Sequence, residues 1–150
     1  MNKLQNQYKP DSVTPPGETL LELLEERSMS QTELAERMGR PKKTISEIIN
    51  AKAAITPDTA LQIENVLGVP AHFWMRREQD YQESLARHRE HERLAQQMEW
   101  LKSFPVREMI KRGWIENKKD KLEQFKAVLI FFGIASPEQW EKYWDGRAVA

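Results

Sequence analysis

Apolar residues along the chain recur mostly at intervals of three and four positions, a spacing that places them on one face of an α-helix. The first clear run carries Leu20, Leu21, Leu23 and Leu24, with glutamates on the opposite face. Residues 121–133, KLEQFKAVLIFFG, show the same spacing, although the central AVLIF alone also fits a buried strand. Because the flanking period is helical and no other segment has a convincing strand pattern, the sequence predicts an all-α protein.

Capping and stop signals divide the first half of the chain into short helices. Ser30 followed by Glu33 forms a capping box, and Gly39 stands where a helix commonly ends. Pro41 then suits the first turn of a new helix, KKTISEIIN, whose isoleucines form a buried stripe. Two short helices joined by a tight glycine turn are typical of a helix-turn-helix.

The second half of the chain begins with a long charged stretch, whose middle, RHREHER, is charged on all sides. Such a pattern is typical of an exposed connecting helix. The C-terminal third is rich in aromatic residues, which we interpret as a small helical core or a protein-binding face. We expect the second interpretation if Trp140 and Trp144, one turn apart, are both exposed.

These patterns predict four parts. They are a flexible N-terminal arm (1–16), a helix-turn-helix DNA-binding domain (17–75), a long connecting helix (76–103) and a small C-terminal helical module (104–150). The arm is assigned because it is polar and three prolines interrupt it.

The overall charge of the chain is uninformative, because 23 basic residues balance 23 acidic ones. The local charge is informative. Between Arg37 and Lys52 there are five basic residues and one acid, whereas the rest of residues 1–70 has three basic residues and nine acids. In a helix-turn-helix, the second helix enters the major groove with its N-terminal residues against the bases. The positive charge therefore lies where a duplex would make contact.

Polar residues of the helix pair supply the candidate contacts to DNA. At the start of the first helix we expect a phosphate contact beside free backbone N–H groups. At the start of the second we expect contacts to phosphate and guanine, followed by contacts in the groove and then to the backbone. The candidates are Gln31 for the phosphate at the first helix; Arg40, Lys42 and Lys43 for phosphate and guanine; Thr44, Ser46 and Glu47 for the groove; and Asn50 and Lys52 for the DNA backbone. A solvated hairpin with a chance basic face is the alternative, but it does not explain the specific spacing.

Other kinds of site find little support in the sequence. There is no cysteine, which excludes disulfides and thiolate metal sites and favours a reducing, cytoplasmic location. The longest apolar run is too short to cross a bilayer, so no membrane partner is expected. His88 and His91 lie three apart in a charged stretch, which we interpret as solvated histidines and not metal ligands. No catalytic arrangement and no cofactor motif is recognised, so the chain is not expected to be an enzyme.

The segments SQTELAERMG, TISEIIN, KAAITPDTALQIE and LGVPAHFW resemble the Xre/HigA-type helix-turn-helix family of antitoxins and phage-repressor-like regulators. The resemblance covers about residues 16–75. It implies a five-helix, lambda-repressor-like domain that binds a palindromic operator as a homodimer and often represses its own operon. It places the phosphate-binding glutamine at Gln31 and the base-reading positions at Pro41, Lys42, Lys43, Ser46 and Glu47. One departure is Ala51, where the family usually has glycine; if a positive φ is needed there, the loop is strained or Asn50 adopts it.

The resemblance leaves two alternatives open. HigA-type members also neutralise a RelE/HigB-like toxin, so masking of such a toxin through protein contacts could be the main function. Some longer members continue into an ImmA/IrrE-type metallopeptidase domain, which needs a His-Glu-x-x-His helix. This chain has no such motif. It would then be either a non-catalytic regulator or the N-terminal regulatory part of a longer protein.

Overall fold

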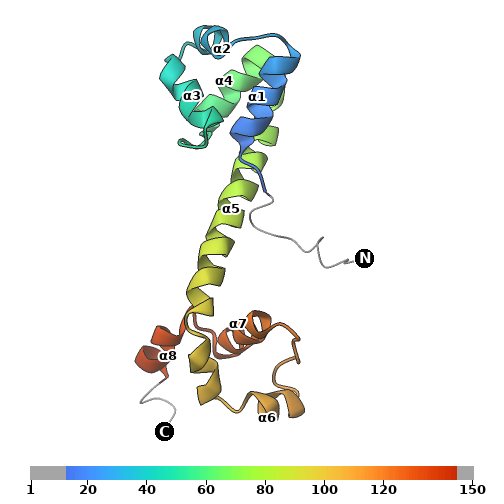
Figure 1. The fold of residues 1–150 in the computed structure, drawn as a ribbon, viewed down its shortest axis with the longest axis vertical. Helices are drawn as coiled ribbons and strands as arrows, with labels where there is room; N and C mark the ends of the chain where they lie inside the picture. The colour runs from blue at the N-terminus through green and yellow to red at the C-terminus, as the bar shows by residue number, and fades with distance from the viewer. Residues whose placement is uncertain (1–12, 145–150) are drawn as a thin grey trace. The chain divides into compact units, whose positions relative to one another are not determined.

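The computed structural model describes residues 13–144 and is built from helices alone in that range (Figure 1). This confirms the all-α prediction, and residues 121–132 form a helix and not a strand. Residues 1–12 of the predicted arm lie outside the described residues. The elements are α1 (Pro16–Glu26), α2 (Gln31–Met38), α3 (Lys42–Ile49), α4 (Pro57–Leu67), α5 (Ala71–Ala95), the 3-10 helix η3 (Met98–Ser103), α6 (Val106–Lys111), α7 (Lys121–Phe132) and α8 (Pro137–Tyr143).

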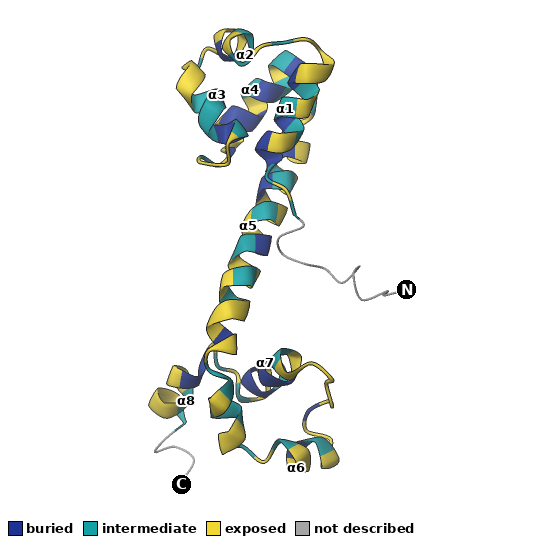
Figure 2. Ribbon diagram, in the orientation of Figure 1, coloured by how far each residue is buried: buried dark blue, intermediate teal, exposed yellow. Residues whose placement is uncertain are grey.

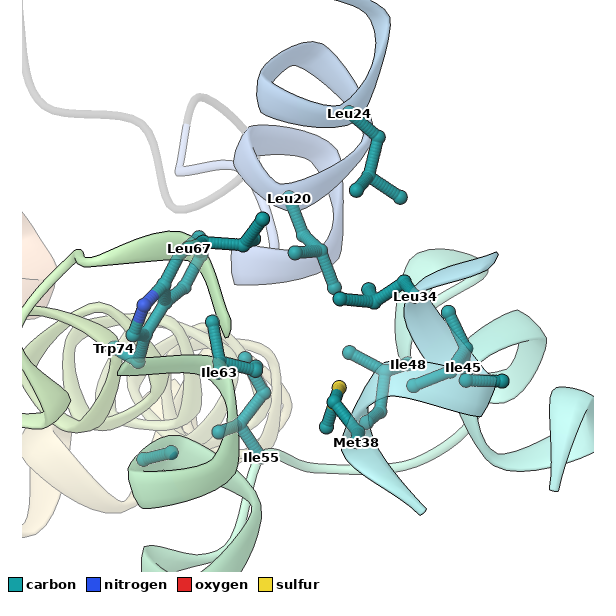
Figure 3. Packing of buried hydrophobic residues seen from close by; sticks show 12 residues of the cluster. Leu20, Leu24, Leu34, Met38, Ile45, Ile48, Ile55, Ile63, Leu67 and Trp74 are labelled. Atoms are coloured by element: carbon teal, nitrogen blue, oxygen red, sulfur yellow. The ribbon is translucent and has the colours of Figure 1, made fainter. Parts of the chain in front are cut away.

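The chain divides into two compact units, and the division falls within α5, after His88. In the N-terminal unit, α1 to α4 and the start of α5 surround a single hydrophobic core (Figure 3). Its buried members are Leu20, Leu24, Leu34, Ala35, Met38, Ile45, Ile48, Ile55, Ala60, Ile63, Leu67 and Trp74. The helical spacing places most of these residues inward. Ile55 is buried from the loop before α4, and Leu61, which the spacing of α4 also places inward, is 51% exposed.

The helix ends of this unit follow the capping signals closely. The Ser30 Oγ accepts a hydrogen bond from the backbone N–H of Glu33 at 3.0 Å, and the Thr56 side chain caps α4 in the same way. Gly39 and Gly68 close α2 and α4 with φ of 71° and 77°, values that favour glycine. Pro41 lies one position earlier than expected, as the N-cap of α3.

The long charged helix is shorter at its C-terminal end than the predicted segment. The α5 helix ends at Ala95, and the chain continues as η3, with Trp100 and Leu101 packed against the core of the C-terminal unit. Neither proline nor glycine marks this break in the sequence. The end is therefore set by tertiary packing of the apolar residues, which local signals do not reveal.

The C-terminal unit has two hydrophobic clusters of its own, one around Leu94, Phe125 and Leu129 and one around Met109, Ile115 and Val128, with partly buried aromatic rings packed against them. The Phe104 ring lies 4.4 Å from that of Trp100 and 5.1 Å from that of Trp140, measured between centroids. The indole N–H of Trp144 donates to the carbonyl oxygen of Phe132 at 3.0 Å. Trp140 and Trp144 are both half-buried, so the core interpretation describes them better than an exposed pair does. Figure 2 shows how buried positions are distributed along these helices.

Two further observations concern the described range as a whole. No helix among residues 13–144 is long and apolar enough to span a membrane. In the same range no three His, Asp or Glu side chains gather into a group that could hold a metal ion.

Candidate nucleic-acid interface

A tight turn sets the angle between α2 and α3. The backbone N–H of Gly39 donates to the carbonyl of Glu36 at 3.2 Å, and that of Arg40 donates to the carbonyl of Ala35 at 2.9 Å. This pattern closes a helix around a left-handed glycine. Because Pro41 then fixes its own φ and caps the next helix, the chain enters α3 with little freedom at the turn.

The inner face of α3 is held by the N-terminal core. Ile45 is fully buried and Ile48 is 3% exposed, and both pack in the cluster that includes Leu34 of α2 (Figure 3). Burial of each such side chain contributes about 1.5–3 kcal/mol. The α3 helix therefore cannot rotate about its axis without exposing its isoleucines, and its opposite face has a defined orientation.

The outer face of α3 begins with exposed residues, two of which are cations. Pro41, Lys42 and Lys43 are all exposed. The Lys43 ammonium lies 3.8 Å from the Glu47 carboxylate, and the Lys43 side chain is 85% exposed. Such a surface pair is worth only a few tenths of a kcal/mol, so Lys43 is readily released to an anion. Lys42 has no ion pair within the described residues.

The other candidates differ in their exposure and in whether they already have a hydrogen-bond partner. Arg40 is half-buried, and its guanidinium donates to the Gln62 side-chain oxygen of α4 at 3.4 Å. Gln31 is half-buried at the first position of α2, and Thr44 and Ser46 are half-buried on α3. Lys52 is exposed in the loop that follows. All the candidates therefore lie on α2, on α3, in the turn between these two helices or in the loop after α3.

Asn50 has a local partner at the end of α3. Its side-chain N–H₂ donates to the backbone carbonyl of Ser46 at 2.8 Å and lies 3.3 Å from the Ser46 hydroxyl. The same carbonyl also accepts the backbone N–H of Asn50 at 3.0 Å, so the Asn50 side chain supplies a second hydrogen bond to it at the C-terminal end of the helix. Asn50 therefore stabilises the helix end in this structure, and a contact to the DNA backbone would compete with that role.

The residue after Asn50 adopts the strained conformation. Ala51 has a φ of 59°, whereas Asn50 has a φ of −89°. The backbone N–H of Lys52 donates to the Glu47 carbonyl at 2.8 Å, which completes the same type of helix end as at Gly39. Of the two outcomes that the departure at Ala51 left open, the structure shows strain at Ala51 itself.

Replacing Ala51 with glycine should stabilise the N-terminal unit. An alanine in the left-handed conformation costs about 1–2 kcal/mol, which glycine would relieve. Part of that gain is lost, because glycine also raises the conformational entropy of the unfolded chain. We expect a net gain of about 0.5–1 kcal/mol, or roughly 4 °C in Tm, in thermal unfolding followed by circular dichroism. The matched control is Ala54→Gly in the same loop, where φ is not positive; it should lower Tm. A lower Tm for Ala51→Gly would contradict the strain.

Two residues that position α3 were not predicted from the sequence. Gly17 in the first turn of α1 is buried against the end of α3, where an added Cβ would lie 2.0 Å from the Ile48 carbonyl oxygen. The Glu78 carboxylate is 7% exposed and accepts from the backbone N–H of Ile55 at 2.7 Å. The signals were present: a glycine inside a helical pattern, and a charged residue one turn after Trp74 on its inward face.

Comparison with known proteins identifies this arrangement. Residues 20–74 match the family model described as helix-turn-helix. Virulence-associated protein A of Dichelobacter nodosus is 34% identical over 90 residues, which span 58% of this chain and 82% of that protein. The chain belongs to the Xre-type helix-turn-helix family. The resemblance on which the sequence analysis relied is thereby confirmed, and the helix-turn-helix protein has the fold of DNA-binding regulators and antitoxins.

Solved structures similar to the helix-turn-helix protein include antitoxins. An addiction module antidote protein of the HigA family from Coxiella burnetii is 28% identical with a TM-score of 0.51, covering 59% of this chain and 95% of that chain. The antitoxin HigA of Pseudomonas aeruginosa, solved with the higBA promoter, is 25% identical with a TM-score of 0.52, covering 55% and 90%. Both likenesses concern little more than half of the helix-turn-helix protein.

Proposed function

We propose that the helix-turn-helix protein is a transcriptional regulator that binds a palindromic operator as a homodimer, with α3 in the major groove. The observation that carries this proposal is the contrast between the two faces of α3. Its isoleucines are buried, whereas Lys42 and Lys43 at its first turn are exposed and only weakly paired. The promoter complex of the Pseudomonas aeruginosa HigA antitoxin supports DNA as the partner.

Each candidate residue then has a role. Lys42 and Lys43 bind phosphate and guanine acceptors, and Gln31 binds a phosphate at the start of α2. Pro41, Thr44, Ser46 and Glu47 lie at the groove, while Arg40, Asn50 and Lys52 contact the backbone at the edges of the site. The Arg40 guanidinium can keep its long hydrogen bond to Gln62 and offer its other N–H groups to a phosphate, whereas the Asn50 contact requires release of Ser46. Asn50 is therefore the weakest contributor.

The proposal is tested by selecting duplexes from a random pool with the parent chain and footprinting the best one. We expect a palindrome whose half-sites lie about 34–36 Å, one helical turn, apart or a multiple of it, and a complex of two chains per duplex by light scattering. A single asymmetric site bound by one chain would contradict the dimer. Equal affinity for all duplexes would contradict sequence-specific binding.

A second function, masking of a RelE/HigB-like toxin, is favoured by the likeness to the addiction module antidote protein of Coxiella burnetii. The two functions are separable, because masking depends on protein contacts and operator binding on the cations of α3. Coexpression with the product of the neighbouring reading frame would show whether a complex forms. A complex that survives substitution of Lys42 and Lys43 supports masking as an independent function.

A further inference from the structure

A cavity of about 640 Å³ lies wholly within the C-terminal unit. It is bounded by η3, by the start of α6 and by the beginning of α7 with the loop before it. Its volume falls within the range of about 300–1,000 Å³ that is usual for small-molecule sites. No residue of α2 or α3 contributes, so the cavity is separate from the candidate nucleic-acid interface.

Part of the lining of this cavity is apolar. Leu101, Phe104 and Val106 line it, and all three also pack on the cores of the C-terminal unit. The Phe104 ring is held by contacts to Phe132 and Trp140, each with a centroid distance of 5.1 Å. A rigid apolar wall of this kind favours the aliphatic or aromatic body of a ligand over a fully polar one.

Another part of the lining is cationic. Lys102, Arg107, Lys118 and Lys121 line it, against the single carboxylate of Glu99. Lys102 pairs with Glu99 at 3.1 Å and Lys118 pairs with Glu116 at 2.8 Å. Within residues 13–144, Arg107 and Lys121 have no ion pair. Two positive charges at the same cavity are therefore uncompensated.

A buried amide fixes the loop that carries Lys118. The Gln124 side chain, 7% exposed, accepts from the backbone N–H of Lys118 at 2.9 Å and donates to the carbonyl of Glu116 at 3.1 Å. The hydrogen bond and charge of Glu116 raise the pKa of Lys118. The loop is thus ordered before any ligand arrives, which lowers the entropic cost of binding.

We infer that this cavity binds a small amphiphilic carboxylate, whose apolar body packs on Leu101, Phe104 and Val106 and whose anionic group pairs with Arg107 and Lys121. Arginine suits this role because its guanidinium can hold a carboxylate through two parallel hydrogen bonds. The volume suits a small molecule, the apolar part of the lining favours a ligand with an apolar body, and the unpaired cations favour one that also carries an anionic group. The inference does not depend on the proposed operator binding.

The test uses the full chain and calorimetric titration with 4-phenylbutyrate, with 4-phenylbutanol as its neutral counterpart. We expect the carboxylate to bind at least about tenfold more tightly than the alcohol, because a charge-assisted contact is worth about 1.5–3 kcal/mol. Arg107→Gln and Lys121→Gln should each weaken carboxylate binding about tenfold. Both positions are exposed, so the fold should tolerate them. Lys119→Gln, an exposed cation that does not line the cavity, is the matched control and should change affinity less than about twofold.

Backbone amide spectra recorded during the titration should show the largest shifts at residues that line the cavity. Three results of these titrations would overturn the inference, and a competing ligand could supply a fourth. The three are equal affinity for the acid and the alcohol, the absence of binding up to about 10 mM, or equal losses in Lys119→Gln and the two cavity variants. Tighter binding of a short acidic peptide than of 4-phenylbutyrate would also overturn it, in favour of a protein ligand.

Discussion

A chain in which Lys42 and Lys43 are both replaced by alanine should bind its operator about a hundredfold more weakly or worse than the parent, with unchanged helical content. Both side chains are exposed, and among the described residues only Lys43 has an ion-pair partner, at 3.8 Å. Their removal therefore leaves no buried charge unpaired. Fluorescence anisotropy with the selected duplex measures the affinity, and circular dichroism measures the helical content.

The salt dependence separates this effect from a general loss of affinity. Each lost phosphate contact should flatten the slope of log K against log salt by about 0.9. The control is Arg76→Ala, which removes an exposed cation from α5 of the same unit and outside the candidate site. Affinity unchanged in the double variant, or reduced equally by Arg76→Ala, would count against α3 as the DNA-binding element.

Gly17→Ala should have the largest effect on stability of any substitution considered. The new methyl carbon would lie 2.0 Å from the Ile48 carbonyl oxygen and 2.7 Å from the Ile49 Cα. Because both contacts are with backbone, no side-chain rotation relieves them. We expect a loss of about 3 kcal/mol, or roughly 15 °C in the Tm of the N-terminal unit, measured by calorimetry. Operator binding should be lost as well, because the end of α3 is displaced.

The neighbouring substitution Glu18→Ala is the control for this prediction. Glu18 is exposed in the same helical turn, so its removal should cost only a few tenths of a kcal/mol through the helix dipole. Amide spectra should retain the signals of the C-terminal unit in both variants, since Gly17 contacts only the N-terminal unit. A Tm for Gly17→Ala within about 2 °C of the parent would show that α1 and α3 can move apart at low cost.

Most of the fold follows from local signals in the sequence. Serine, threonine, glycine and proline mark where helices begin and end, and the helical period places the core residues inward. The end of α5 could not be predicted in this way. It depends on Trp100 and Leu101 packing against α7, a contact between residues far apart in the chain.

The charges of the candidate site were predictable from the sequence, but the residues that its side chains and helices contact within the protein were not. The cations of α3 are evident from the sequence, because clustering is a local property. That Arg40 reaches Gln62 on α4, and that Gly17 allows α1 to approach Ile48, depends on how the helices cross. The strain at Ala51 is an intermediate case. The resemblance indicated where strain could arise, but only the backbone dihedral angles show that Ala51, and not Asn50, adopts the positive φ.

The carboxylate of Glu78 has a practical consequence for dissecting the chain. It holds the loop after α3 through the Ile55 N–H and is itself held by the Gln82 amide at 2.8 Å. A fragment cut at residue 74, where the family match ends, would lack this tether and leave the amide of Ile55 without its acceptor. The shortest autonomous piece that presents α3 correctly must therefore extend beyond Gln82.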